Sequence, residues 1–385
     1  MDFTFTEEQQ LLRRTVHDFA VKELAPSARE RDAREEFPWE QFRSLGKLGL
    51  TGLAIPPDLD GSGGGIVETA VVVEELARTD PGVSLSFLAS HSLTALGIQR
   101  FATDAQCRKY VPPLARGEVM GAFAYTEPDA GSDAAALATT AILDNDHYVL
   151  NGTKIFITNG DIAETFLAFA TEDRGKRHRG IMAFIVERGF PGLQTIPQRD
   201  KLGMRSSDTA EVSFHACRVP AENRIGGDGQ GFKIGMQVLE GSRPIIGAQA
   251  VGIAQGAFDL ALGHVQQRRQ FGQSLSEFQG VQWMLADMAT RIDAARLLVY
   301  RAASLRDQGQ GSAKESSMAK LFASETATYV ASTALQLHGG SGYFKDSPIE
   351  RFFRDAKVTE IYEGTSQIQR LIIARHILAQ QSSPP

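Results

Sequence analysis

The spacing of hydrophobic residues changes twice along this chain, from a helical period to a β-type pattern and back. Near the start, Leu11, Leu12, Val16 and Phe19 recur at intervals of three and four residues, which is typical of one helix face. Short runs bounded by turn residues follow, and the helical period returns after Gly231. A chain of 385 residues also exceeds the length at which one hydrophobic core stops growing. The sequence therefore predicts a mostly α protein with a central β domain, divided as follows: N-terminal helical domain 1–117, β-barrel domain 118–228, C-terminal helical bundle 229–380 and polar tail 381–385.

The middle part contains several short runs with β character. They lie at 137–143, 148–150, 154–158, 165–171 and 181–186. Asp144-Asn145-Asp146, Asn151-Gly152 and Asn159-Gly160 interrupt them, and residues of this kind favour tight turns. Short strands joined by such turns predict a small antiparallel barrel or sandwich.

Composition excludes several classes of protein. The net charge is −6, with 42% hydrophobic and 22% charged residues, so no electrostatic footprint for nucleic acid is present. Cys107 and Cys217 are too few and too far apart for a zinc site or a disulfide framework, so we expect no metal and a reducing compartment, the cytoplasm or an equivalent such as the mitochondrial matrix. No run of about eighteen apolar residues is evident, so we expect no membrane span. The first residues lack the basic and apolar regions of a secretory signal.

A glycine-rich segment at 56–65 invites a dinucleotide-binding interpretation, which we reject. A phosphate-binding loop follows a strand and opens a helix inside a βαβ unit, and no parallel-strand pattern surrounds this segment. A surface loop is the better prediction.

One carboxylate near the C-terminus has an unusual setting. Glu363 lies in the polar segment Tyr362-Glu363-Gly364-Thr365-Ser366-Gln367, with apolar residues at helical spacing on both sides. We therefore expect a helix to be interrupted or restarted there, and such a turn can direct a side chain into a cavity. A solvated loop glutamate is the alternative, and a catalytic base is our hypothesis.

Four other segments are polar or glycine-rich for their positions. They combine aromatic rings, hydroxyl groups, an arginine and glycine backbone amides, which together suit a planar cofactor with a diphosphate. The segments are 123–133, 156–160, 268–272 and 336–340.

Taken as an ordered set, these segments resemble the acyl-CoA dehydrogenase family over almost the whole chain, closest to its medium- and short-chain members. The resemblance rests on Tyr125-Thr126-Glu127-Pro128 with Gly131-Ser132-Asp133, on Asn151-Gly152-Thr153-Lys154, on Arg268 with Phe271-Gly272, and on the Glu363 segment. It implies an N-terminal helical domain, a central β-barrel and a C-terminal four-helix bundle. It also implies FAD as cofactor, an acyl-CoA substrate, a homotetramer and an electron-transfer flavoprotein as electron acceptor.

The resemblance assigns roles residue by residue. Glu363 matches the catalytic base. The FAD contacts are Phe123, Tyr125, Thr126, Phe156, Thr158, Arg268, Phe271, Gln279, Gln336, Gly339, Gly340, Thr365 and Gln367, several of them reaching a flavin held mostly by a neighbouring subunit. The acyl-CoA contacts are Ser132, Glu240, Arg243 and Gly364. Phe156 departs from the tryptophan of many members, and Asp129 stands where glycine is frequent.

The implied reaction is α,β-dehydrogenation of an acyl-CoA thioester to the trans-2-enoyl-CoA. Glu363 takes the α-proton and the β-hydride goes to flavin N5. Burial is expected to raise the pKa of Glu363 and strengthen it as a base. Two alternatives stay open: a flavin-dependent oxidase or monooxygenase of the same fold, and a non-enzymatic acyl-CoA-binding scaffold. The acyl chain length is not given by the sequence; residues around His91 to Leu96 and Leu239 are expected at the base of the acyl cavity.

Overall fold

The computed structural model describes residues 4–381, so residues 382–385 of the expected polar tail lie outside the described part. The first third is helical, and a capping box formed by Thr6 and Gln9 opens its first helix. The helices are α1 (Glu7–Phe19), α2 (Ala28–Arg34), α3 (Trp39–Lys47), α4 (Ile66–Ala77), α5 (Pro81–Leu88), α6 (Leu96–Phe101) and α7 (Asp104–Ala115). A π-helical stretch, η4 (Ala89–Ala95), joins α5 to α6.

An eight-stranded sheet forms the middle of the chain. Its strands are β1 (Gly121–Ala124), β2 (Thr140–Asp144), β3 (His147–Thr158), β4 (Thr165–Thr171), β5 (Ile181–Glu187), β6 (Leu193–Pro197), β7 (Thr209–Pro220) and β8 (Arg224–Ile225). They pair in the order β6-β7-β3-β2-β4-β5-β8, with β1 added beside β4. Most pairs are antiparallel, whereas β1 and β2 each pair with β4 in parallel. The run at 165–171 coincides with β4.

The turn expected at Asn151-Gly152 was wrong, because β3 continues through it from His147 to Thr158. The pairing of β3 with β7 instead shifts register between Leu150 and Gly152 and again between Lys154 and Ile157. An added Cβ at Gly152, which has a φ of 148°, would lie 2.5 Å from the Thr139 hydroxyl. The glycine therefore permits a bulge and a close approach of neighbouring strands, and not a hairpin turn.

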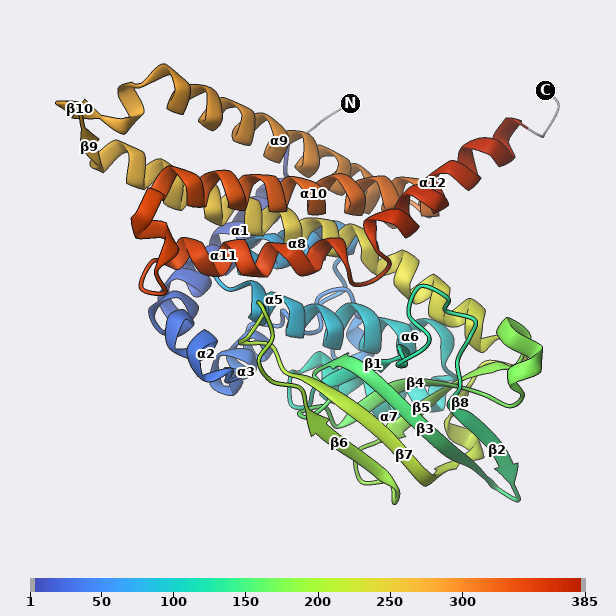
Figure 1. Cartoon of the computed structure of the whole chain (residues 1–385). Helices are drawn as coiled ribbons and strands as arrows, with labels where there is room; N and C mark the ends of the chain where they lie inside the picture. Colours follow the sequence, from blue (N-terminus) through green and yellow to red (C-terminus); the bar gives the residue numbers. More distant parts are fainter. Residues whose placement is uncertain (1–3, 382–385) are drawn as a thin grey trace.

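Long helices form the last third (Figure 1). They are α8 (Gly231–Gln267), α9 (Gln279–Asp307), α10 (Ala313–His338), α11 (Pro348–Ala356) and α12 (Ser366–Gln381). In Figure 1, α8 to α11 lie side by side as an upper layer, with the sheet below at the right and the N-terminal helices below and behind. A small hairpin, β9 (Arg269–Gln270) with β10 (Gln273–Ser274), projects from one end, and α12 extends away from the other.

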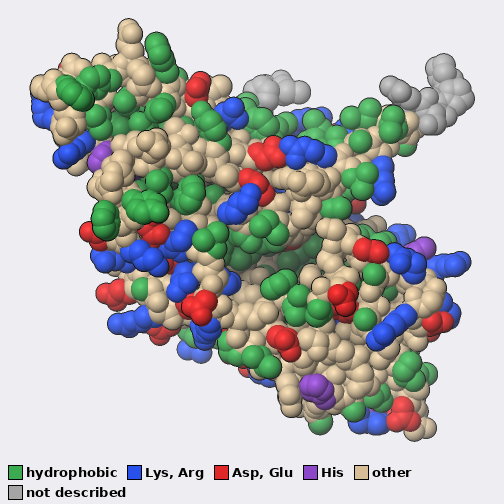
Figure 2. Space-filling model, in the orientation of Figure 1, with side chains coloured by type: hydrophobic (Ala, Val, Ile, Leu, Met, Phe, Trp, Pro, Cys, Tyr) green, Lys and Arg blue, Asp and Glu red, His purple; other side chains and the backbone are tan. Residues whose placement is uncertain are grey.

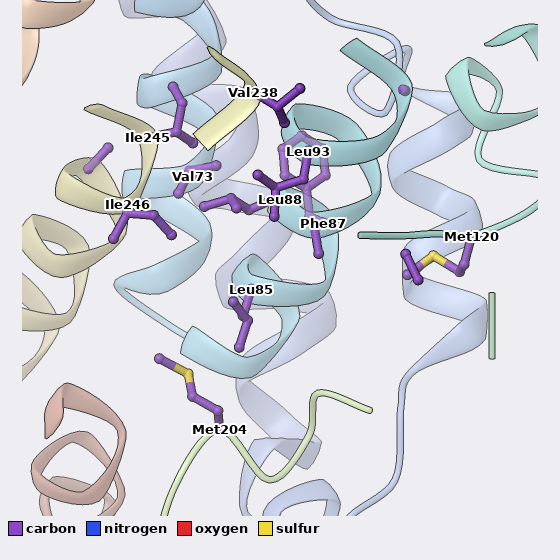
Figure 3. Packing of buried hydrophobic residues seen from close by; sticks show 14 of the residues in the cluster. Val73, Leu85, Phe87, Leu88, Leu93, Met120, Met204, Val238, Ile245 and Ile246 are labelled. Carbon is purple, nitrogen blue, oxygen red and sulfur yellow. The ribbon is translucent and has the colours of Figure 1, made fainter. Parts of the chain in front are cut away.

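One hydrophobic core joins the three parts. Figure 3 shows Phe87 and Leu88 of α5, Leu93 of η4 and Val238 of α8 pointing toward one another between the ribbons. All four are buried, which places the α8 turn around Val238 inside the core. Polar bonds add to this junction, since the Met204 backbone N–H donates to the Asp355 carboxylate of α11 over 2.5 Å. The elements around the turn after α11 are thereby fixed to the rest of the molecule.

Among the described residues, α8 alone is long and apolar enough to meet the length and composition criteria for a membrane span. One such helix is weak evidence for a span, so the expectation of no membrane span stays a prediction. Of its apolar window, 72% is buried inside the protein, as in the core helix of a globular protein.

The glycine-rich segment at 56–65 leads into α4, and a carboxylate of this chain covers the start of that helix. Asp307, at the end of α9, accepts from the backbone N–H groups of Ile66 and Val67 over 2.7 and 3.0 Å. An N-terminus that already binds an anionic side chain has no need of a phosphate. The interpretation of this segment as a structural loop agrees with the geometry.

Candidate active site

Glu363 occupies a strained turn between the end of α11 and the start of α12. Its φ is 50° and that of Gly364 is 92°, so both residues have left-handed backbone conformations. Glutamate rarely adopts such a conformation, and it persists only where the surrounding structure enforces it. The expected helix interruption at this position agrees with the geometry.

Two side chains hold the turn, and both were missed from sequence. Lys320 of α10 is fully buried, and its Nζ donates to the Gly364 carbonyl over 2.9 Å. Gln369 of α12 donates through Nε2 to the carbonyls of Glu363 and Gly364, over 3.2 and 2.8 Å. The backbone of the turn is therefore fixed from two helices.

Three groups surround the Glu363 carboxylate. The hydroxyl of Ser242, on α8, donates to Oε2, and Arg243 and Lys320 are nearby cations. Burial of the carboxylate raises its pKa to about 7, and the Ser242 hydrogen bond and the two cations lower it only in part. Burial likewise lowers the pKa of Lys320 to about 8. The result is a carboxyl group that changes protonation near neutral pH.

The neighbouring Tyr362 ties the turn to the N-terminal helices. Its hydroxyl donates to the side-chain oxygen of Gln249 on α8. Gln249 in turn donates to the Pro81 carbonyl over 3.1 Å and to the Ser84 hydroxyl over 2.8 Å. The position of Glu363 thus depends on contacts with α5 as well as with the C-terminal bundle.

The residues expected to bind the CoA part fall into two groups. Glu240 and Arg243 lie on α8 beside Ser242, and Glu240 forms a 2.8 Å ion pair with Arg306. Arg243 is buried, yet its guanidinium forms no hydrogen bond or ion pair within residues 4–381, so it is free to bind an anionic or carbonyl group. Ser132 is exposed in the loop after β1, and no described contact joins it to Glu363.

A second group of predicted residues lies where the sheet meets α8. Phe123 and Tyr125 stack with ring centroids 5.9 Å apart, and a Cβ added at Gly235 of α8 would lie 2.7 Å from the Tyr125 ring. Gly235 precedes Ser242 by seven residues, which is about 10 Å along a helix. The aromatic pair therefore lies within reach of the Glu363 turn.

Three residues of this group, Thr126 after β1 and Phe156 and Thr158 of β3, have side chains free to bind a ligand. The hydroxyls of Thr126 and Thr158 are half-buried and have no hydrogen-bond partner among the described residues. Phe156 is 67% exposed, and its φ of 58° falls at the register shift in β3. An exposed aromatic ring on strained backbone beside two free hydroxyls indicates a surface that binds a flat ligand.

The remaining FAD contacts predicted from the resemblance lie at the opposite end of the bundle. Arg268 follows α8, and 26 residues separate it from Ser242, or about 39 Å along a helix. Phe271, at the tip of the β9–β10 hairpin, is 93% exposed with a φ of 52°. The other members of this far group are Gln279, Gln336, Gly339 and Gly340, all exposed. The structure does not bring the far group to the Glu363 turn of the same chain.

Thr365 and Gln367 lie where α12 begins. The Thr365 hydroxyl accepts from the Ile368 backbone N–H over 3.3 Å, so within this chain it caps the helix. Gln367 is exposed on the first turn of α12. Neither residue has an unpaired buried polar atom that would indicate a bound ligand.

Figure 2 shows a hollow lined by hydrophobic side chains between the C-terminal bundle at the top and the β-rich part below. A cavity of about 240 Å³ lies on the face of α8 that carries Val238, Gly241 and Ile245, next to Ser242. Ser92 and Leu96 line this cavity, whereas His91, Leu239 and Glu363 do not, so the location of the acyl cavity stays a prediction. His91 is buried with Nδ1 2.9 Å from the Thr51 carbonyl, and burial lowers its pKa to about 4. It is therefore a neutral packing residue.

Comparison with known proteins identifies this arrangement. The models described as the N-terminal, middle and C-terminal domains of acyl-CoA dehydrogenase match residues 6–118, 122–217 and 229–378. Acryloyl-CoA reductase (NADH) of Anaerotignum propionicum is 48% identical, over 98% of this chain and 96% of its own length. The short-chain specific acyl-CoA dehydrogenase of Clostridium acetobutylicum is 47% identical, over 98% of this chain and 100% of its own.

Solved structures agree. Butyryl-CoA dehydrogenase of Megasphaera elsdenii has a TM-score of 0.96 at 43% identity, covering 98% of this chain and 100% of its own. A chain of the structure described as the electron transferring flavoprotein of Acidaminococcus fermentans has a TM-score of 0.97 at 45% identity, with the same coverage. At the level of the family, the predicted fold, enzyme class and FAD cofactor are confirmed. The chain belongs to the acyl-CoA dehydrogenase family.

Proposed function

We propose that this protein dehydrogenates a short-chain acyl-CoA thioester to the trans-2-enoyl-CoA, with Glu363 as the base. The Glu363 carboxylate carries the proposal, because burial raises its pKa to about 7 and a left-handed turn holds it beside Arg243 and Lys320. A base is most effective when its pKa lies near the working pH, since it is then both ionised and basic. Membership of the acyl-CoA dehydrogenase family is the basis for the class of reaction.

In the proposed reaction, Glu363 removes the proton α to the thioester carbonyl. The backbone N–H of Glu363 donates to no described residue, so it is available to bind the thioester oxygen and stabilise the charge that develops there. FAD, when bound, supplies the acceptor for the β-hydride. Loss of the α-proton and the β-hydride leaves the new carbon–carbon double bond.

The residues near Glu363 fit the flavin ring of FAD. Thr126 and Thr158 offer unpaired hydroxyls, and Phe156 offers an exposed aromatic face. Phe123 and Tyr125 form the adjoining packed wall. We propose that these five residues hold the ring end of the cofactor.

We propose a homotetramer in which a neighbouring chain completes each FAD site. Two observations support this: Arg268 of the far group lies about 39 Å along α8 from Ser242, which contacts Glu363, and Phe271 of the same group is 93% exposed. Trp283, Tyr343 and Phe344 are also exposed on the C-terminal third, at 67%, 83% and 66%, which favours contact with another chain. We also propose that the three domains meet at 117/118 and 228/229.

The names of the relatives support a substrate length and an electron acceptor for this proposal. Two of them are named for short-chain or butyryl substrates, and we propose the same class here. We propose an electron-transfer flavoprotein as acceptor, supported by the chain matched in the Acidaminococcus fermentans structure. Both cysteines are free, which suits a reducing compartment such as the cytoplasm.

A panel of acyl-CoA substrates of increasing chain length, assayed with an artificial electron acceptor, tests this function. We expect formation of the 2-enoyl-CoA, fastest with a four-carbon chain. Slow reoxidation of the reduced protein by oxygen would separate it from an oxidase. Absence of enoyl-CoA with every substrate, in protein that contains FAD, would contradict the proposal.

A further inference from the structure

The Ser242 hydroxyl lies between two acceptors. It is 3.0 Å from the carbonyl oxygen of Leu239, one turn back on α8, and it also contacts Oε2 of Glu363. A serine hydroxyl has one proton to donate and lone pairs with which to accept. It therefore cannot donate to both oxygens at once, and one of the two contacts must change character with the protonation of Glu363.

Each protonation state of Glu363 has a satisfied arrangement. When the carboxylate is ionised, the Ser242 proton points to it in a charge-assisted hydrogen bond. When Glu363 holds a proton, its O–H donates to the Ser242 oxygen, and the Ser242 proton turns to the Leu239 carbonyl. No bond other than hydrogen bonds is made or broken, and no heavy atom needs to move.

We propose that Ser242 is a positioning residue whose hydroxyl rotates between Glu363 and the Leu239 carbonyl as Glu363 takes up and releases the substrate proton. This inference rests on the proposed function, in which Glu363 is the base. It adds a residue that keeps both states of the base hydrogen-bonded inside a buried site, where an unpaired polar group is costly.

Other charged groups near Glu363 do not offer this exchange. Arg243 faces it from α8 and Lys320 from α10, and both remain donors in either state. Tyr362, on the same turn, already donates to Gln249. The charges behind these groups are Glu240 and Arg306, which pair with each other, and Glu360, Glu325 and Asp355. They influence the acidity of the site but do not touch the Glu363 carboxylate.

Ser242→Ala tests the inference through the pH dependence of flavin reduction by substrate. In this variant the ionised carboxylate loses a charge-assisted hydrogen bond, whereas the protonated form loses only a neutral one, so the pKa of Glu363 rises. The acidic limb, the part of the pH–rate profile where protonation of Glu363 slows flavin reduction, is therefore expected to move to higher pH by about one unit. Ser242→Gly should give the same upward shift, and Ser242→Thr, which keeps the hydroxyl, should restore the original limb. FAD content should not change.

Ser324→Ala is the matched control. Ser324 is a fully buried helix serine whose hydroxyl donates to the Lys320 carbonyl over 2.8 Å and contacts no carboxylate, so its removal should not move the limb. An unmoved limb in Ser242→Ala and Ser242→Gly, with rates lowered equally at every pH, would overturn the Ser242 role. Glu363→Gln is run alongside: rapid flavin reduction in that variant would instead withdraw Glu363 as the base.

Discussion

Lys320 donates a 2.9 Å hydrogen bond to the carbonyl of Gly364, the residue directly after Glu363. Lys320 lies about two turns from the start of α10 and is fully buried, so a rigid helix fixes the backbone of the turn that carries the carboxylate. Gln369 supports the same carbonyl from α12 over 2.8 Å. Together they explain how a glutamate stays in a left-handed conformation.

Lys320→Met is expected to slow flavin reduction by about ten- to a hundred-fold, the scale of loss seen when a reacting group is misplaced by about 1 Å. The variant keeps the side-chain volume but removes both the anchor of Gly364 and a cation that lowers the pKa of Glu363. Stopped-flow measurement with a saturating acyl-CoA provides the rate. Lys314→Met, in the first turn of the same helix, is the control and should keep the wild-type rate. An undiminished rate in Lys320→Met would show that the turn holds its shape without this contact.

Thr126→Val and Thr158→Val are each expected to weaken FAD binding about five-fold, the equivalent of one hydrogen bond of about 1 kcal/mol. Titration of the apoprotein with FAD, followed by fluorescence, measures the change. Thr153→Val, on β3 with Thr158, is the control, because its hydroxyl already pairs with that of Ser213 over 2.9 Å. It should lower stability and leave FAD affinity as it was. Unchanged affinity in both Thr126→Val and Thr158→Val would place the flavin ring elsewhere.

Two inactive variants are expected to restore activity when co-assembled. Arg268→Glu disables the FAD site of the neighbouring chain, and Glu363→Gln disables the site of its own chain. In a mixed assembly, a chain with intact Glu363 can receive Arg268 from its neighbour, so part of the activity returns. Each variant is assayed alone and after co-expression, with the assembly size measured by light scattering. Failure of co-expressed chains to regain activity, in mixed tetramers that hold FAD, would mean that each site is complete within one chain.

Glu363→Gln is expected to stabilise the protein at pH 8 and to have little effect at pH 4. Burial raises the pKa of Glu363 to about 7 from its ordinary 4.5, so between these values the folded protein holds a proton that the unfolded chain has released. Stability therefore falls as the pH rises through this window, by about 3 kcal/mol for this group, and glutamine removes the loss. Thermal unfolding at both pH values measures the difference. A lower midpoint for the variant at pH 8, at equal FAD content, would contradict the burial of the carboxylate.

The sequence predicted the parts of this fold that depend on local pattern. The period of apolar residues located the long helices, and β4 coincides with the run at 165–171. The prediction of a turn at Asn151-Gly152 was wrong because an Asn-Gly pair also occurs at β-bulges. Only the pairing of β3 with β7 distinguishes a bulge from a hairpin turn.

Site residues were predicted where the local sequence around them has a distinctive pattern. They were missed where their role depends on a contact with a residue far away in the sequence. Glu363 stood out as a carboxylate on a glycine-containing turn. Ser242 and Lys320, which hold it, lie 121 and 44 residues away from the positions they contact. Their contacts arise from the packing of α8 and α10 against the turn. A lysine inside the apolar stripe around Met318 and Leu321 was the one local signal, since a buried lysine needs a partner.

The most direct test of the account is anaerobic flavin bleaching in Glu363→Gln on mixing with a saturating acyl-CoA. The substitution keeps the shape of the side chain and removes the base, so the protein should retain FAD and bind the acyl-CoA nearly as well. Glu360→Gln, three residues earlier and paired with Lys357, is the matched control and should bleach normally. Removal of a general base typically slows a reaction by roughly a hundred- to ten-thousand-fold. We expect bleaching in Glu363→Gln to be slower by at least this factor. Bleaching at the wild-type rate would show that another group takes the α-proton and would contradict the assignment of Glu363.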